Sequence, residues 1–171
     1  MKSRIILAAF LADPAFAEPV FIDRADGLPA QHVYAGGWEH FVGGGVAVFD
    51  CNADGRPDIF AAGGENPAQL FVNVTARPGA PLVFAEGGIQ ELTHVTGAYP
   101  LDIDGDGRLD LAVLRVGYDL LLRGGPGCTF TDASGDWGFH PRDTWTTAFT
   151  ATWERGQAFP TLAFGHYVDR S

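Results

Sequence analysis

Two short acidic segments of the chain carry oxygen-bearing side chains at a regular spacing. They read Asp50-Cys51-Asn52-Ala53-Asp54-Gly55-Arg56-Pro57-Asp58 and Asp102-Ile103-Asp104-Gly105-Asp106-Gly107-Arg108-Leu109-Asp110. Aspartate or asparagine stands at positions 1, 3, 5 and 9 of each, and glycine at position 6 permits a sharp turn. Calcium takes six to eight hard oxygen ligands, and alternate side chains of a tight loop turn inward together. The spacing therefore predicts one calcium site in each segment.

Acidic turns without an ion, EF-hands and magnesium sites are all less consistent with these segments. Acidic turns without an ion are disfavoured, because two carboxylates about 4 Å apart repel by about 4 kcal/mol at an effective dielectric constant near 20. An EF-hand needs a glutamate at position 12 and a helix on each side, whereas position 12 is Ala61 or Val113. The flanking residues are apolar and often β-branched, so each loop is expected to join two strands. Magnesium fits less well because it prefers fewer protein ligands.

The strands that must position these loops belong to an internal repeat. Residues 45–60 align without gaps on residues 97–112, a period of 52 residues. Each copy continues with another apolar segment, at 69–73 or 118–122, then a turn rich in glycine and proline, and then a phenylalanine close to an acidic residue. A unit of this size with four short strands matches one blade of a β-propeller. The predicted fold is all-β, a partial propeller of about two to three four-stranded blades.

The predicted boundaries follow this repeat. The first repeat covers about 43–92, the second about 95–140, and a degenerate third about 144–171. In the third, aligning the first strand puts Thr150 at the position of Asp50, and aligning the second strand puts Thr152 there. Either alignment removes the acidic ligands, so no site is predicted in the third loop.

These motifs resemble the FG-GAP/VCBS repeats of integrin-α-like propellers, over about residues 20–171. The phrases at 44–50 and 162–169 are similar to the ASPIC/UnbV or cartilage-acidic-protein branch. The resemblance implies a calcium-binding scaffold for adhesion or extracellular assembly, with arginine at position 7 giving its backbone carbonyl and keeping its side chain outside. The implied calcium ligands are Asp50, Asn52, Asp54, Arg56 and Asp58, and Asp102, Asp104, Asp106, Arg108 and Asp110.

The N-terminus predicts export. Basic residues at 2 and 4, an apolar run at 5–12 and Ala15-Phe16-Ala17 form a secretory signal peptide over 1–17, leaving 18–171 as the mature segment. The expected location is therefore secreted, periplasmic or on the cell surface, where disulfides are permitted. Cys51 and Cys128 could pair, or could remain two independent thiols.

Composition excludes several kinds of partner. The net charge is −10 and the chain has a single lysine, so a nucleic-acid partner, which needs a clustered basic face, is not expected. The chain has no apolar run long enough to span a membrane. A protein or cell-surface partner is expected, with a glycan as a possible ligand.

No enzyme motif is found. Serines after residue 17 are Ser134 and Ser171, neither in G-x-S-x-G, and a P-loop lysine is missing. The five histidines are dispersed without zinc-ligand spacing. The leading hypothesis is a non-catalytic binding or adhesion scaffold. The alternatives are a carbohydrate-binding, lectin-like propeller and an accessory module of a longer protein. Since propellers have typically four to eight blades, the chain is expected to be a fragment or to complete its ring by association.

Overall fold

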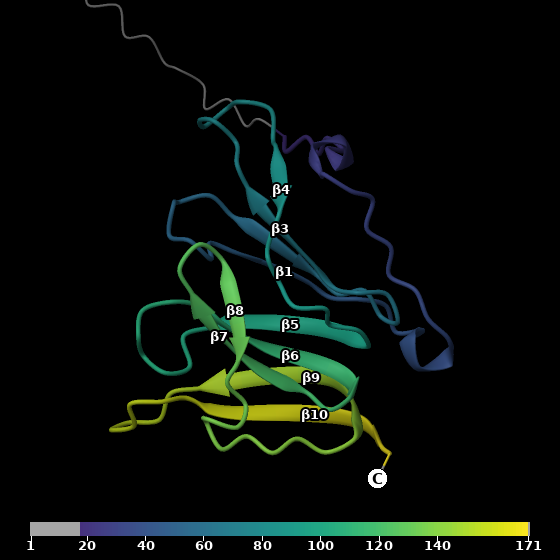
Figure 1. Ribbon diagram of the computed structural model, residues 1–171, viewed down its shortest axis with the longest axis vertical. Helices are drawn as coiled ribbons and strands as arrows, with labels where there is room; N and C mark the ends of the chain where they lie inside the picture. The colour runs from purple at the N-terminus through teal and green to yellow at the C-terminus, as the bar shows by residue number, and fades with distance from the viewer. Residues whose placement is uncertain (1–17, 171) are drawn as a thin grey trace, which may run out of the picture.

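The protein is built from antiparallel β-strands (Figure 1). The computed structural model describes residues 18–170, and the proposed signal peptide at 1–17 lies outside them. In the described part, the helical elements are two single 3-10 turns, Ala25–Gly27 and Trp38–His40. No helix among the described residues is long and apolar enough to cross a membrane. The predicted all-β class is confirmed.

The first sheet is a four-stranded meander. Its strands are β1 (Val46–Phe49), β2 (Asp58–Ala61), β3 (Gln69–Asn73) and β4 (Phe84–Glu86), hydrogen-bonded in that order. Side chains alternate along β1, so one face of this strand is buried and the other is exposed, as expected for a strand at one end of a sheet. All four strands lie within the predicted first repeat.

The second sheet repeats this meander and adds a hairpin. Strand β6 pairs with β5 on one side and with β7 on the other, β7 pairs with β8, and the last two residues of β6 also pair with the start of β9. The strands are β5 (Val95–Leu101), β6 (Asp110–Gly117), β7 (Leu120–Gly125), β8 (Thr129–Asp132), β9 (Thr144–Thr152) and β10 (Thr161–Asp169).

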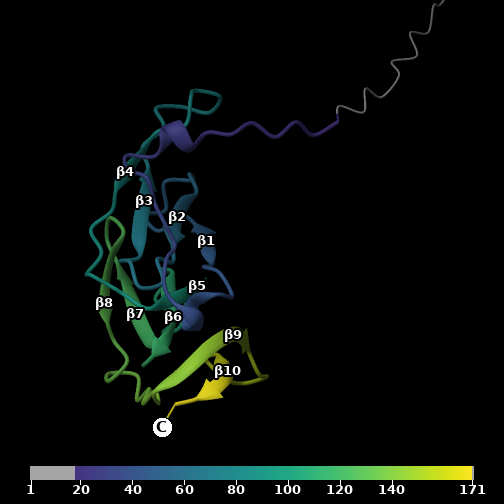
Figure 2. The same ribbon diagram turned by 90° about the vertical axis from the view of Figure 1, so that its right-hand side faces the viewer.

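The two meanders and the hairpin follow one another along the long axis of the molecule (Figure 2). Strand β1 lies beside β5, and β5 lies beside β9, so the first strand of each unit is a neighbour of the next. One apolar core lies between the two meanders, where Phe49 meets Phe130 edge to face. A second core lies between the second meander and the hairpin, where Phe164 packs.

Two adjacent glycines allow the close approach of β1 to its surroundings. A Cβ on Gly44 would lie 2.2 Å from the ring of Tyr34, and one on Gly45 would lie 3.0 Å from the Cα of Gly97. The N–H of Gly45 donates to the carbonyl of Thr96 at 2.8 Å, which ties the start of the first meander to β5. Gly44 is thus required by packing against Tyr34, and Gly45 by the close approach of the first meander to β5.

The predicted strand at 118–122 is shifted. Strand β7 begins at Leu120, because Tyr118 and Asp119 form the turn after β6. Asp119 Oδ1 accepts the N–H of Arg115 at 2.8 Å, and this bond closes the turn. A short polar side chain that satisfies backbone groups competes with strand pairing, which the apolar pattern alone does not reveal.

The pairing of β9 with β10 shows that both sequence alignments of the degenerate third loop are wrong. Phe49 pairs with Asp58, Leu101 with Asp110, and Thr152 with Thr161, so the loops at 50–57, 102–109 and 153–160 have equal length. Trp153, and neither Thr150 nor Thr152, therefore occupies the position of Asp50, and Thr161 that of Asp58. The predicted loss of the acidic residues in this loop holds in the observed register.

Candidate functional site

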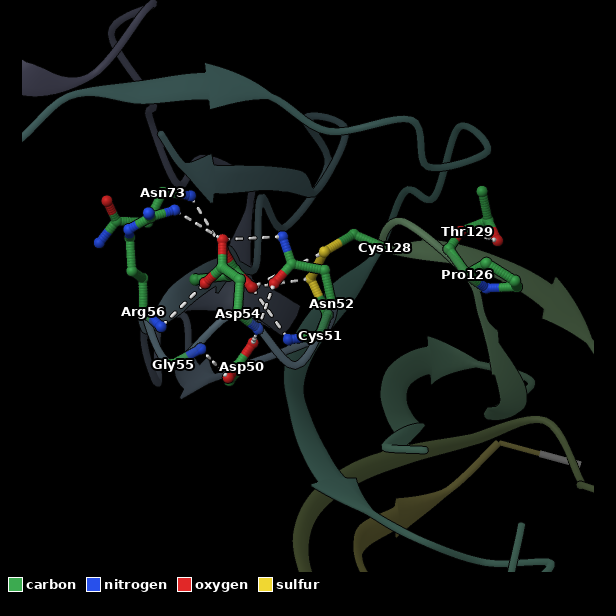
Figure 3. Close-up of a disulfide and its surroundings, with 11 residues drawn as sticks. Asp50, Cys51, Asn52, Asp54, Gly55, Arg56, Asn73, Pro126, Cys128 and Thr129 are labelled. Atoms are coloured by element: carbon green, nitrogen blue, oxygen red, sulfur yellow. Dashed lines mark hydrogen bonds and ion pairs between the residues drawn. A yellow bond between two sulfur atoms is a disulfide. The ribbon is translucent and has the colours of Figure 1, made fainter. Parts of the chain in front are cut away.

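The first acidic loop connects β1 to β2 and folds around its own side chains (Figure 3). Asp50 accepts the backbone N–H of Asp54 at 3.1 Å and that of Gly55 at 2.7 Å. Asn52 Oδ1 accepts the same Asp54 N–H at 3.1 Å, and its amide donates to Asp54 Oδ2 at 3.3 Å. The side chains at positions 1, 3 and 5 therefore gather on one side of the loop.

The second acidic loop connects β5 to β6 and has similar internal bonding, with the N–H of position 4 in place of that of position 5 as one donor to the first aspartate. Asp102 accepts the N–H of Gly105 at 2.7 Å and that of Gly107 at 3.0 Å. Asp104 accepts the N–H of Asp106 at 3.3 Å. Carboxylate oxygens of Asp102, Asp104 and Asp106 all lie within 4.8 Å of one another. The structure thus brings together three of the four side chains expected to bind calcium in this loop.

The backbone conformation is also shared by the two loops. Position 6 has positive φ in both, 78° at Gly55 and 83° at Gly107. Position 4 is left-handed as well, at Gly105 with φ 77° and at Ala53 with φ 59°. A residue with a Cβ pays about 1 kcal/mol or more in this region, so Ala53 adopts it only because the surrounding loop requires it. Two different sequences therefore fold into one loop geometry.

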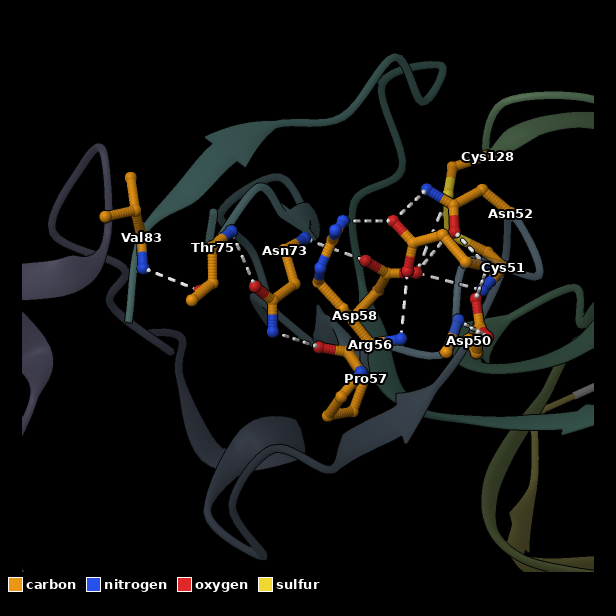
Figure 4. Close-up of polar contacts among 12 residues, drawn as sticks. Asp50, Cys51, Asn52, Arg56, Pro57, Asp58, Asn73, Thr75, Val83 and Cys128 are labelled. Atoms are coloured by element: carbon orange, nitrogen blue, oxygen red, sulfur yellow. Dashed lines mark hydrogen bonds and ion pairs between the residues drawn. A yellow bond between two sulfur atoms is a disulfide. The ribbon is translucent and has the colours of Figure 1, made fainter. Parts of the chain in front are cut away.

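The aspartate at position 9 is buried below each loop and holds the backbone. Asp58 and Asp110 are both 0% exposed. Asp58 accepts the N–H of Cys51 at 2.9 Å and that of Asn73, in β3, at 2.8 Å (Figure 4). Asp110 accepts the N–H of Ile103 at 2.8 Å and that of Gly124, in β7, at 2.8 Å. Each carboxylate thus joins its loop to the third strand of its meander.

This bonding adds a role that sequence analysis missed. The spacing predicts a metal ligand at position 9, and the structure places there a structural acceptor with both oxygens engaged. Each oxygen of a carboxylate has two lone pairs, so one backbone N–H per oxygen leaves capacity for an ion. The presence of aspartate at position 9 in both loops is the signal that could have suggested this second role.

The arginine side chains at position 7 are partly exposed, and each pairs with the carboxylate at position 5 of its own loop. Arg56 Nη1 lies 2.8 Å from Asp54 Oδ2, and Arg108 Nη1 lies 3.0 Å from Asp106 Oδ2. Each guanidinium therefore sits on the carboxylate at position 5 and offsets part of its charge. A bound cation would have to compete with each arginine for this carboxylate.

A third arginine contacts the second loop from the neighbouring strand. Arg123, in β7, lies 3.1 Å from Asp104 and 3.4 Å from Asp136, and its guanidinium lies 5.0 Å from the ring centre of Trp137. No local motif signals this contact, since only the pairing of β6 with β7 brings Arg123 beside the loop. The second loop therefore holds two arginines against its acids.

Burial and hydrogen bonding shift the acids of the second loop in opposite directions. The N–H of Arg108, followed by its guanidinium, lowers the pKa of Asp106 below its usual value. Burial raises the pKa of Asp110, and the N–H groups of Gly124 and Ile103 offset part of this effect. Hydrogen bonding therefore favours the anionic form of the exposed Asp106, the form that binds a cation, whereas burial disfavours the anionic form of Asp110.

The residues present fit calcium better than a softer metal. Both loops supply carboxylate oxygens, and the first adds the amide oxygen of Asn52; such oxygens are the ligands of hard cations. Converging carboxylates repel one another, and a cation at their centre would remove this repulsion. The second loop offers a fuller set of carboxylates than the first, where Asn52 replaces one of them.

The two cysteines form a disulfide between the meanders. Cys51, at position 2 of the first loop, is bonded to Cys128, in the turn between β7 and β8. The Sγ of Cys51 lies 2.9 Å from Asp58 Oδ2. A small cavity of about 110 Å³ is bordered by residues 50–53 of the first loop, 107–109 of the second and 125–127 of this turn. The alternative of two independent thiols is therefore not what the structure shows.

A buried polar network at the opposite end of the strands fixes the hairpin to the second meander. Asp119 Oδ2 accepts the hydroxyl of Thr146 at 2.7 Å, and the same hydroxyl lies 2.8 Å from His166 Nδ1. Burial raises the pKa of Asp119, and the Thr146 hydroxyl offsets part of this shift. Sequence analysis missed these residues, because they come from three separate strands and turns.

We expect Thr146→Val to destabilise the protein by about 1–3 kcal/mol, since it leaves the buried Asp119 carboxylate without one of its donors. The shape of the side chain is nearly retained, so the loss reports the hydrogen bonds. Chemical denaturation measures the change. Thr147→Val, on the exposed side of the same strand, is the matched control and should change stability by less than about 0.5 kcal/mol. Equal effects of the two variants would contradict this role of the network.

Comparison with known proteins adds one finding on the acidic loops. Residues 50–113 match the family model described as an FG-GAP-like repeat. A comparison with curated proteins found no match. The matched segment begins at the first residue of the first loop and ends in β6, so it contains both acidic loops and the strands between them. This part of the chain is therefore similar to FG-GAP-like repeats, which agrees with its β-rich, repeated architecture.

Proposed function

We propose that the protein is an exported calcium-binding segment of a β-propeller and that it acts as a non-catalytic scaffold for a protein or cell-surface partner. The observation that carries this proposal is the repetition of one loop geometry at two places, with acidic side chains gathered at the same positions. Repeated carboxylate clusters need a cation to offset their repulsion. The match to an FG-GAP-like repeat supports the same function.

The arrangement of strands supports the propeller part of the proposal. The meanders are four-stranded, like propeller blades, and their first strands β1, β5 and β9 are successive neighbours. The disulfide supports export, because such bonds persist mainly in oxidising compartments. On this view the acidic loops brace the blades, and the exposed loops at the ends of the strands are free to meet a partner.

Calcium titration by isothermal calorimetry tests the metal assignment. We expect the parent chain to bind two calcium ions, with dissociation constants of roughly 10⁻⁴ to 10⁻³ M as in other extracellular modules. Asp54→Asn and Asp106→Asn should each abolish one of the two binding events. Glu154→Gln, in the third loop, is the matched control and should retain both. A parent chain that binds no calcium at millimolar concentration would refute the assignment.

Arg108→Gln should strengthen calcium binding by the second loop up to about fivefold. The substitution removes a guanidinium 3.0 Å from Asp106 but retains the backbone carbonyl of position 7. An exposed ion pair contributes at most about 1 kcal/mol, which limits the gain. The same calorimetric titration measures it. Arg77→Gln removes an equal charge from the connection between β3 and β4 and should leave the affinity nearly unchanged, whereas weaker binding by Arg108→Gln would contradict the competition.

A pocket beside the second loop favours carbohydrate binding as a second candidate function. It encloses about 530 Å³ between the second meander and the hairpin. Its wall combines the rings of Trp137 and Phe159 with the charged groups of Arg123 and Asp136. Aromatic rings stack on the apolar face of a sugar, and adjacent charged groups bind its hydroxyls.

A glycan array with the parent chain and Trp137→Ala tests this candidate. Binding of an oligosaccharide that is lost in Trp137→Ala and retained in Trp153→Ala would support it, since Trp153 is exposed outside the pocket. If no glycan binds, the carbohydrate candidate fails and the calcium scaffold is unaffected.

A further inference from the structure

The disulfide and a buried aspartate form a compact group of possible metal ligands. Oxygen or sulfur atoms of Cys51, Asp58 and Cys128 all lie within 4.8 Å of one another. Asp58 Oδ2 is 2.9 Å from the Sγ of Cys51 and 3.7 Å from that of Cys128. Asp58 is fully buried and Cys128 is 1% exposed. The disulfide and the backbone donors of Asp58 therefore hold these three side chains together (Figure 4).

The sulfurs of the disulfide neither donate a hydrogen bond to Asp58 nor bind a metal strongly. A disulfide has no S–H to donate, so the short contacts with Asp58 are not hydrogen bonds, and its sulfurs are weak ligands compared with thiolates. The hydrogen bonds of Asp58 come from the N–H groups of Cys51 and Asn73. Among residues 18–170, no arginine, lysine or histidine forms an ion pair with Asp58. Its charge is thus offset by hydrogen bonds alone.

We propose that reduction of the disulfide creates a binding site for a thiophilic divalent cation such as Zn²⁺, with Cys51, Cys128 and Asp58 as its ligands. Thiolate sulfur selects zinc over calcium, and a carboxylate oxygen commonly completes such sites. The cation offsets two of the three negative charges that the two thiolates and the carboxylate would otherwise bring into a buried site. The site shares Asp58 with the calcium ligands expected in the first loop, so the titration is made without calcium.

Reduction of the disulfide requires two electrons and two protons. A phosphine reductant supplies two electrons and is oxidised to the phosphine oxide, while water supplies the oxygen and the two protons of the new thiols. Zn²⁺ then replaces both thiol protons, which pass to solvent, and Asp58 binds as a carboxylate. The three protein ligands leave one tetrahedral position, which a water molecule would occupy.

The second loop is an internal control that isolates the role of sulfur. Ile103 stands where Cys51 stands, and its N–H donates to Asp110 Oδ2 at 2.8 Å, as that of Cys51 does to Asp58 at 2.9 Å. Both loops thus have the same buried carboxylate with the same donors, but only the first adds two sulfur atoms. The proposed zinc site belongs to the first loop alone.

Cobalt(II) is the probe, because its bonds to thiolate give an intense charge-transfer absorption. The full chain is reduced with a phosphine, freed of reductant without oxygen, and titrated with Co²⁺. We expect one equivalent to bind with a thiolate charge-transfer band, and one equivalent of Zn²⁺ to abolish the band. The oxidised chain should show no such band. Reduced Asp58→Asn should keep the band but bind at least about tenfold more weakly.

Serine variants distinguish a built site from loose thiols. Cys51→Ser and Cys128→Ser lack the disulfide just as the reduced parent does, so none of the three chains is cross-linked. Each variant should bind the metal at least about tenfold more weakly than the reduced parent. If the reduced parent is unfolded, one equivalent of Zn²⁺ should restore its near-ultraviolet circular dichroism. The proposal is overturned if the reduced parent shows no thiolate band, if the serine variants bind as tightly, or if zinc leaves an unfolded chain unfolded.

Discussion

The thermal unfolding midpoint of the parent chain should rise when calcium is added and fall again with a chelator. Ion binding to the folded state contributes about 2.7 kcal/mol per site at a hundredfold excess over the dissociation constant, so two sites together would contribute about 5 kcal/mol. Because extracellular modules bind at roughly 10⁻⁴ to 10⁻³ M, a hundredfold excess corresponds to roughly 10 to 100 mM calcium, and about 1 mM calcium should give only about 0.4 to 1.4 kcal/mol per site. Differential scanning calorimetry at several calcium concentrations measures it.

Single-ligand variants divide this stabilisation between the two loops. Asp106→Ala and Asp54→Ala should each lose about half of the calcium-dependent shift, because each removes the carboxylate at position 5 of one loop. Glu154→Ala should retain the whole shift, since the third loop has Trp153 and Thr161 at the positions of the outer acids. Indifference of the parent to both calcium and chelator would mean that the loops are only acidic turns.

Removal of the disulfide should cost the protein about 4 kcal/mol of its free energy of unfolding. Cys51 and Cys128 are 77 residues apart, and the entropy of closing a loop of this length in the unfolded chain gives this magnitude. The bond also joins the first acidic loop to the second meander, so its loss weakens the contact between the two sheets. Urea denaturation of the parent and of the Cys51→Ser/Cys128→Ser double variant, both in calcium, measures the difference.

A control separates the covalent bond from the packing of the sulfur atoms. The parent reduced with a phosphine, measured in the same calcium-containing buffer, keeps both sulfurs and should lose a similar amount of stability. Reduced parent and double variant should therefore unfold at nearly the same urea concentration. An unchanged midpoint in both would show that the two sheets are held by their apolar core alone, with Phe49 against Phe130.

The strand-loop-strand units could be predicted because their signals are local. Apolar residues before and after each acidic loop, and glycine at position 6, act between near neighbours in sequence, and β1–β2 and β5–β6 form as antiparallel pairs around the loops. The segment at 69–73 also forms the expected strand, β3. The third hairpin shows where such prediction fails. Its loop has no acidic ligands by which to align it, so its register is known only from the pairing of β9 with β10, and this register differs from both sequence alignments.

The candidate site was predictable only in its outline. Spacing alone predicts that positions 1, 3 and 5 converge, and carboxylates of Asp102, Asp104 and Asp106 do lie close together. Spacing does not predict that Asp110 turns toward the N–H of Gly124, since that donor belongs to β7 and reaches the loop only through the pairing of β6 with β7. The same pairing brings Arg123 to Asp104.

Local patterns were sufficient to predict the all-β class, the repeat and the places of the two acidic loops, because alternation and turn chemistry depend on residues a few positions apart. The bond between Cys51 and Cys128, and the link that Thr146 makes between Asp119 and His166, came from the folded arrangement of the strands. These contacts join segments that are distant in sequence, and they form where sheet stacking and strand register bring the side chains together. Register is set by the packing of whole strands, which no short segment of sequence specifies.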